Sequence, residues 1–120
     1  MPQYVDGFVL PVPTKNLAAY RKLAKKASRV WLEHGALEYR ECVGEDLNTP
    51  FGRTFPELVK PKKGEALVFS WITYKSRAHR DRVNAKVMQD PRMLKDCDPG
   101  KLPFDVKRMS WGGFATLVQA

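Results

Sequence analysis

The sequence lacks the features that would place it in a membrane or outside the cell. No apolar stretch approaches the roughly 20 residues that a membrane-spanning helix needs, and the first ten residues have neither the basic nor the apolar region of a signal peptide. We therefore expect a cytoplasmic protein with no membrane partner. Cysteine is scarce as well: Cys42 and Cys97 stand apart, and we expect both to be free thiols in a reducing compartment.

The sequence also lacks the common catalytic signatures. It has two histidines and two cysteines at unrelated positions, which make a poor metal-ligand set. It has no Ser/His/Asp pattern and no phosphate-binding loop, because Gly112 and Gly113 are not followed by a helix. The sequence therefore predicts neither a metal nor a cofactor.

What is present is the composition of one globular domain. A chain of 120 residues with 43% hydrophobic and 28% charged residues has room for one core, and we assign residues 1–120 to a single domain. Lys and Arg outnumber Asp and Glu by 21 to 13, for a net charge of +8. A basic surface favours anionic partners. The basic residues are spread over helices and loops, however, so RNA or DNA binding is an alternative and not the leading hypothesis.

Hydrophobic periodicity predicts the order strand, helix, strand, strand, helix, strand. The expected strands are Tyr4–Val12, Leu37–Val43, Leu67–Tyr74 and Arg108–Val118, and the expected helices begin near Leu17, ending before Gly35, and span Arg77–Gln89. Gly112 and Gly113 are typical of a bulge that bends the last strand. Residues 44–64 and 90–105 are expected to be loops, and Phe51, Phe55 and Leu58 give the first loop apolar anchors that favour docking on a dimer partner.

This order predicts an α+β, ferredoxin-like βαββαβ fold, with one four-stranded antiparallel sheet and two helices on one face. The first and third strands are central and apolar on both sides. The sheet face without helices must then be buried, and a second copy of the chain is the simplest cover. We therefore expect a homodimer.

Five segments carry a resemblance to a known family: YVDGFVLPVP, EHGA, VFSWITYKSRAHRD, NAKVMQDPRM and PFDVKRMSWGGF. They resemble the YbaA-like family, domain of unknown function 1428, in the dimeric α/β-barrel superfamily. The resemblance implies a ferredoxin-like chain and a dimer whose two sheets pack face to face as a barrel. It implies no particular reaction, because that superfamily holds monooxygenases, isomerases, haem enzymes and ligand-sensing domains.

The strongest site candidates lie at one end of the predicted sheet. His34 falls on the buried stripe of the first helix, and Arg80 and Asn84 fall on that of the second. Asp6 and Trp71 lie on central strands near the same end. We expect these side chains to converge in a pocket between helices and sheet. Three alternatives stay open: His34 is a satisfied core residue, Arg80 reaches solvent while Asn84 holds a backbone group, and strand alternation turns Asp6 or Trp71 toward the dimer barrel.

If the pocket supports chemistry, His34 would be the general acid or base, Arg80 the anchor for an anion and Trp71 a wall for an aromatic ligand. Asp105 and Arg108 lie at the opposite end and are second-rank ligand-binding candidates. The simpler interpretation of Asp105, Lys107 and Arg108 is a solvated strand entry with a local ion pair.

Three functions are compatible with these patterns. The leading one is a dimer that binds a small anionic or aromatic organic molecule, with cofactor-independent catalysis as an extension. The others are a basic RNA- or DNA-binding module and a non-catalytic, stress-related or structural dimer.

Overall fold

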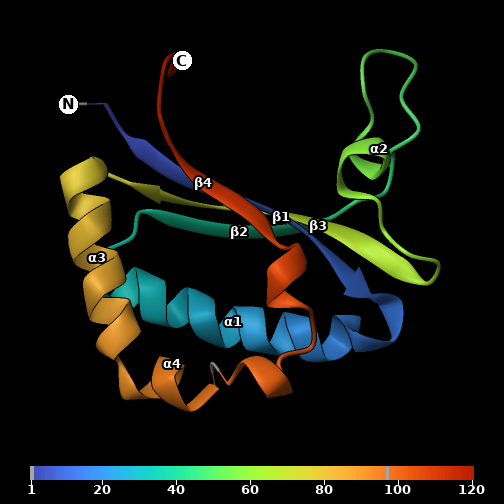
Figure 1. Cartoon of the computed structure of the whole chain (residues 1–120). Coiled ribbons are helices and arrows are strands. Elements are labelled where there is room, and N and C mark those ends of the chain that lie inside the picture. Colours follow the sequence, from blue (N-terminus) through green and yellow to red (C-terminus); the bar gives the residue numbers. More distant parts are fainter. Residues whose placement is uncertain (1, 97) are drawn as a thin grey trace.

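The computed structural model describes residues 2–96 and 98–120, which form one four-stranded antiparallel sheet with helices (Figure 1). The strands are β1 (Tyr4–Pro13), β2 (Glu38–Val43), β3 (Glu65–Tyr74) and β4 (Ser110–Ala115), in the spatial order β2-β3-β1-β4. The α-helices are α1 (Leu17–Glu33), α2 (Phe55–Val59), α3 (Arg77–Gln89) and α4 (Pro91–Asp96). The predicted ferredoxin-like arrangement, with the first and third strands central, is confirmed.

The central pair β1 and β3 is the longest ladder of the sheet. It runs without interruption from the pair Tyr4 and Tyr74 to the pair Pro13 and Glu65. β4 pairs with β1 only as far as Val9, so Pro11 lies where a missing backbone N–H removes no bond to β4.

Alternation along the strands divides the sheet into a helix face and a free face. On the helix face, α1 and α3 cover the sheet, and α4 packs at their ends (Figure 1). Gly35, with φ of +114°, lies just beyond α1, and the Ser76 hydroxyl caps α3 by accepting from the His79 N–H at 3.1 Å. The core on this side is aliphatic and includes Leu10, Val12, Val30, Val68, Ile72, Val83 and Val87.

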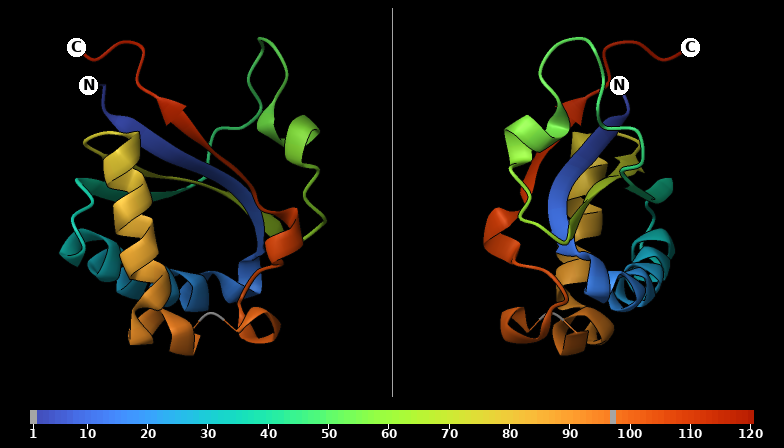
Figure 2. Two further views of the ribbon diagram at one scale, coloured as in Figure 1. Left: turned by 60° about the vertical axis from the view of Figure 1, so that its left-hand side comes forward. Right: turned by 90° about the vertical axis from the view of Figure 1, so that its right-hand side faces the viewer.

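The free face carries no core helix. The residues of β1, β3 and β4 on this face are Val5, Gly7, Val9, Phe69, Trp71, Thr73, Ser110, Gly112 and Phe114. The segment with α2 and the C-terminal tail both stand on this side of the sheet, opposite α1 and α4 (Figures 1 and 2). The bare face predicted from the apolar central strands is therefore present in the single chain.

Three predicted segments differ from the structure. β4 begins at Ser110, so Arg108 lies in a short 3₁₀ turn before it, and the strand ends at Ala115. The loop 44–64 contains α2, and the loop 90–105 contains α4. Both helices begin with polar caps that a search for apolar periodicity overlooks. The Thr54 hydroxyl accepts from the Glu57 N–H at 3.3 Å, and Pro56 lies in the first turn of α2.

The glycine pair of β4 does not form a bulge. Asp6 pairs with Gly113 and Gly7 with Gly112, in continuous register. A Cβ atom on Gly113 would overlap the Arg80 guanidinium and the Tyr4 ring. Gly113 therefore makes room for two side chains that lie across the strand.

Candidate functional site

A buried carboxylate, Asp6, organises the polar groups between the sheet and α3. Asp6 is 1% exposed, and its Oδ1 accepts from Arg80 Nε at 3.0 Å. Its Oδ2 accepts from Asn84 Nδ2 at 3.3 Å. Arg80 and Asn84 are four residues apart on one face of α3, which places both over the same strand residue. We call Asp6, Arg80, Asn84, Tyr74 and Trp31 the Asp6 network.

The remaining members of the Asp6 network complete its hydrogen bonds. The Tyr74 hydroxyl and the Trp31 indole N–H both donate to Asn84 Oδ1, each at 3.0 Å. Burial, with the nearby Asp6 charge, raises the pKa of Tyr74 well above its ordinary value, so the hydroxyl stays a donor. Among the described residues, no buried side-chain nitrogen or oxygen is without a partner. The network is satisfied within the chain and offers no orphaned polar atom to a ligand.

Arg80 is held on three sides. Besides Asp6, it donates from Nη1 to Asp81 Oδ1 at 2.8 Å, and its guanidinium lies over the Tyr4 ring, 4.9 Å from the centroid. The structure therefore brings together three of the predicted site residues, Asp6, Arg80 and Asn84.

His34 does not join that group. Its Nε2 lies 2.8 Å from Asp90 Oδ2, and Asp90 also accepts from Arg92 Nε at 3.0 Å and Nη2 at 2.9 Å. The hydrogen bonds from Arg92, and then from His34, hold the pKa of the Asp90 carboxyl far below its usual range. His34 thus ties the end of α1 to the junction of α3 and α4.

Trp71 is on the opposite face of the sheet from the Asp6 network. Its Nε1 donates to Glu38 Oε1 at 2.8 Å, and Arg40 lies 5.6 Å from its ring centroid. These two β2 side chains fix the indole at the edge of the free face. The predicted convergence of Trp71 and His34 with Arg80 is therefore wrong, because strand alternation puts Trp71 on one face and Asp90 draws His34 to another contact.

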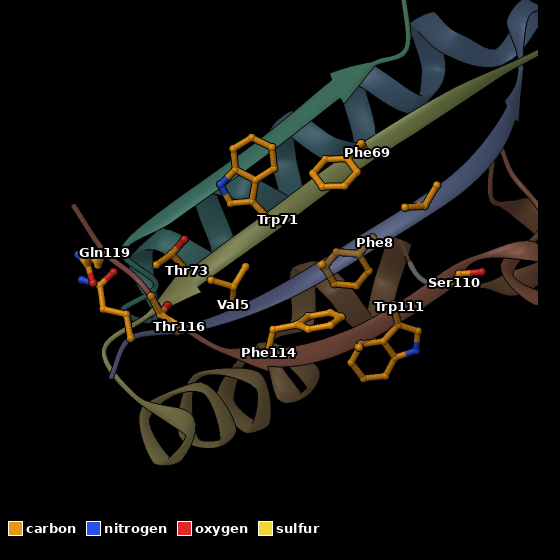
Figure 3. A pocket seen from close by; sticks show the side chains of 14 residues that line it. Val5, Phe8, Phe69, Trp71, Thr73, Ser110, Trp111, Phe114, Thr116 and Gln119 are labelled. Carbon is orange, nitrogen blue, oxygen red and sulfur yellow. The ribbon is translucent and has the colours of Figure 1, made fainter. Parts of the chain in front are cut away.

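The free face is hollowed into an aromatic cavity of about 810 Å³. Figure 3 shows the side chains of Phe69 and Trp71 from β3 and of Phe114 from β4 gathered on this face. The Phe69 and Trp71 rings pack edge to face with centroids 5.6 Å apart. Gly7 and Gly112 have no side chain to fill the floor of the cavity, and among the described residues the Phe114 ring is the group within 4 Å of a Cβ atom built at either position. None of the described side chains that line the cavity is ionisable.

Sequence reasoning missed most of this cavity. Phe69 and Phe114 received no role, although Phe69 lies two residues from Trp71 in a strand and therefore shares its face. For β3, the alternation of residues between the two faces was enough to place Phe69 beside Trp71. For β4 the signal was weaker, because its register depended on the expected bulge at Gly112 and Gly113.

The second-rank candidates lie elsewhere and contact different groups from those expected. Arg108 binds Glu65, with Nη2 donating to Oε1 at 2.9 Å, and the hydrogen bonds from Arg108 lower the pKa of the Glu65 carboxyl. Asp105 Oδ1 accepts from the Lys107 N–H at 3.0 Å and caps a 3₁₀ turn. In place of the predicted local ion pair within Asp105, Lys107 and Arg108, the structure has a bridge from Arg108 to Glu65 of β3.

In residues 2–96 and 98–120, no group of three or more His, Cys, Asp or Glu side chains is arranged to hold a metal ion. No helix in this part of the chain is long and apolar enough to cross a membrane.

Comparisons with known proteins agree with the fold. Residues 3–106 match a family described as a protein of unknown function, DUF1428. The uncharacterized protein YbaA of Escherichia coli strain K12 is 43% identical over 116 residues, which cover 97% of each chain, and YbaA of Shigella flexneri gives the same values. The crystal structure of a dimeric ferredoxin-like protein from an uncultured marine organism aligns over 100% of both chains with a TM-score of 0.60 and 14% identity. At that identity the likeness shows the fold alone.

Proposed function

Because this chain belongs to the DUF1428 family of proteins of unknown function, we propose its role from its own geometry: it is a cytoplasmic homodimer whose free faces pack together and bind a small aromatic organic molecule. The aromatic cavity on the free face is the observation that carries this proposal. Its volume of about 810 Å³ lies in the range of small-molecule sites.

Exposure of the cavity walls supports the dimer. Phe114 is 63% exposed and Phe69 is 43% exposed, and both lie on one continuous face. Contiguous apolar patches of this kind are rare on monomers and mark interaction sites. The solved structure with the same fold is described as dimeric, which supports the same assembly for this chain.

The chemistry of the cavity defines the ligand. Its rings can stack on a flat aromatic group. Arg40 lies beside Trp71, within 3.5 Å of Glu38 Oε2, and would have to exchange that contact to bind an anionic substituent. We assign neither His34 nor Arg80 a role in this site, because both are engaged elsewhere. We propose binding without a reaction, because the described lining offers no general acid or base.

The test combines oligomeric state with a fluorescent probe, 8-anilinonaphthalene-1-sulfonate, which is aromatic and anionic. We expect a dimer by sedimentation and a rise in probe fluorescence. Trp71→Ala should lose most of that fluorescence and weaken the dimer, whereas Leu94→Ala, at an exposed site on α4, should change neither. A monomer at all concentrations, or equal probe binding by Trp71→Ala, would overturn the proposal.

A second candidate function is nucleic-acid binding through the outer face of α1. Arg21, Lys22, Lys25 and Arg29 are exposed there, and residues 17–32 contain no Asp or Glu. This function predicts affinity for RNA or DNA that falls steeply with added salt. Undetectable RNA and DNA binding at low salt would rule out this second candidate function.

A further inference from the structure

The segment between β2 and β3, residues 44–64, stands away from the rest of the chain. We call it the α2 arm. It rises from the sheet on the side of the free face, and α1 and α4 lie on the other side (Figures 1 and 2). Surface connections commonly carry function, and connections longer than about 15 residues are uncommon.

The base of the α2 arm is attached to the wall of the aromatic cavity. The Phe55 ring packs edge to face on the Phe69 ring, with centroids 6.1 Å apart. Phe69 lines the cavity. The arm and the free face therefore form one continuous apolar surface, and whatever covers the free face must lie beside the arm.

The apolar side chains farther along the arm are left uncovered by this chain. Phe51 is 85% exposed and Leu58 is 61% exposed. The Thr54 side chain caps α2, the short helix that carries Leu58. Two large apolar side chains displayed on an ordered arm are typical of a docking surface.

Charge indicates what the arm docks on. Residues 44–59 carry three acidic side chains, Glu45, Asp46 and Glu57, against one basic side chain, Arg53, in a chain with a net charge of +8. This part of the arm, which carries Phe51 and Leu58, is therefore net acidic, whereas the remainder of the chain, including Lys60, Lys62 and Lys63 where the arm returns to β3, is net basic. A second copy of this chain presents both the apolar face and the complementary charge.

We infer that the α2 arm of each chain packs on the second copy, where Phe51 and Leu58 cover the open side of the other copy's aromatic cavity. The inference rests on the proposed face-to-face dimer. It makes each binding site a product of two chains: the sheet of one chain supplies the floor and walls, and the arm of the other supplies the cover.

Photocrosslinking tests the contact directly. The photoreactive residue p-benzoylphenylalanine replaces Phe51 in one variant and Lys25, on the outer face of α1, in a control. Irradiation of the Phe51 variant should give a covalent dimer, with the crosslinked peptide mapping to the free face or its rim. The Lys25 variant should give none.

Substitution of the cover gives a second measurement. The double variant Phe51→Ser, Leu58→Ser should raise the dimer dissociation constant at least tenfold and reduce the fluorescence of bound 8-anilinonaphthalene-1-sulfonate. Leu94→Ser, at a site with 66% exposure on α4, is the matched control and should do neither. Circular dichroism of all variants checks that the fold is retained.

The outcomes separate the two proposals. A wild-type chain that is monomeric at every concentration would overturn the dimer and the arm contact together. A wild-type dimer that binds the probe, but gives no crosslink between chains from position 51 and keeps its dissociation constant in the double variant, would overturn the arm contact alone.

Discussion

The two faces of the sheet use the same strands for opposite purposes. On the helix face, Asp6 lies in a network in which every member has a hydrogen-bond partner. On the free face, the neighbouring residues Val5 and Gly7 border a cavity walled by exposed aromatic rings. The polar groups on the helix face are satisfied within one chain, whereas the free face leaves Phe69 and Phe114 exposed. A cluster of polar residues in a sequence is therefore weak evidence for a binding site by itself.

The difference follows from the cost of burying each kind of group. A buried carboxylate or guanidinium without a partner is strongly unfavourable, so the chain must supply the partners as it folds. Leaving an aromatic ring exposed costs the folded chain far less free energy. When a partner or ligand covers the ring, its burial is favourable. The predictions below test this comparison between the Asp6 network and the aromatic cavity.

The largest effect is expected from Asp6→Ala. The substitution leaves the Arg80 guanidinium and the Asn84 amide beside the sheet without their acceptor. Breaking a buried ion pair from one side typically lowers the free energy of unfolding by about 3–5 kcal/mol. Urea unfolding monitored by circular dichroism measures the change.

The control for that prediction is Asp81→Ala. Asp81 accepts from the same guanidinium but is 54% exposed in its side chain, so the loss should stay below about 1 kcal/mol. Similar losses for the two variants would show that the network is not the structural centre of the helix face.

The next effect belongs to the free face. Phe114→Lys places a charge in the proposed dimer interface without touching the helix-side core. We expect the dimer dissociation constant to rise about 100-fold or more, equivalent to about 2.7 kcal/mol, with the protomer's far-ultraviolet spectrum unchanged. Sedimentation equilibrium measures it. A variant that unfolds instead would show that the free face contributes to the stability of the single chain.

Much of the fold was predictable because its signals are local. The apolar runs of β1 and β3, the stripe of α1 and the Ser76 cap each involve neighbours in sequence. α2 and α4 were missed because five- and six-residue helices show too little periodicity and are defined by caps. The end of β4 was misplaced because it depends on where β1 stops pairing, which is a long-range property.

The candidate site was predictable only in part for the same reason. Arg80 and Asn84 share one face of α3, and topology alone brings that face to the end of β1 that carries Asp6. The face of Trp71 depends on the register of its strand, and the contact of His34 depends on how Asp90 ends α3. Neither can be derived from spacing.

A smaller effect is expected from Gly113→Ala, which tests how closely the Asp6 network packs against β4. The added methyl group would overlap Arg80 and Tyr4, whose positions are fixed by Asp6 and by their mutual stacking. Overpacking of this kind typically costs about 1–3 kcal/mol. Gly112→Ala is the matched control, because among the described residues its Cβ atom would meet the Phe114 ring alone, in ordinary van der Waals contact at 3.8 Å. Equal costs at both positions would contradict the assigned role of Gly113.

The last prediction concerns the pH dependence of the helix face. Hydrogen bonds from Arg92 and His34 lower the pKa of Asp90 in the folded chain, whereas an unfolded Asp titrates near 3.9. A lowered folded pKa contributes stability that is present above the unfolded value and is lost as the pH falls through the folded one. The wild-type free energy of unfolding should therefore fall as the pH drops below about 4, and Asp90→Asn should flatten that slope.

Acid could also change stability through the proposed dimer. The measurement is therefore made in Phe114→Lys, which we expect to be monomeric. In the Phe114→Lys chain, only the protomer's own groups contribute to the slope. Arg92→Leu should flatten it as Asp90→Asn does, since it removes the donors that lower the Asp90 pKa. Glu33, whose pKa Arg92 also lowers, adds to the effect of Arg92→Leu. An acid slope left unchanged by both substitutions would show that this cluster does not couple protonation to the stability of the helix face.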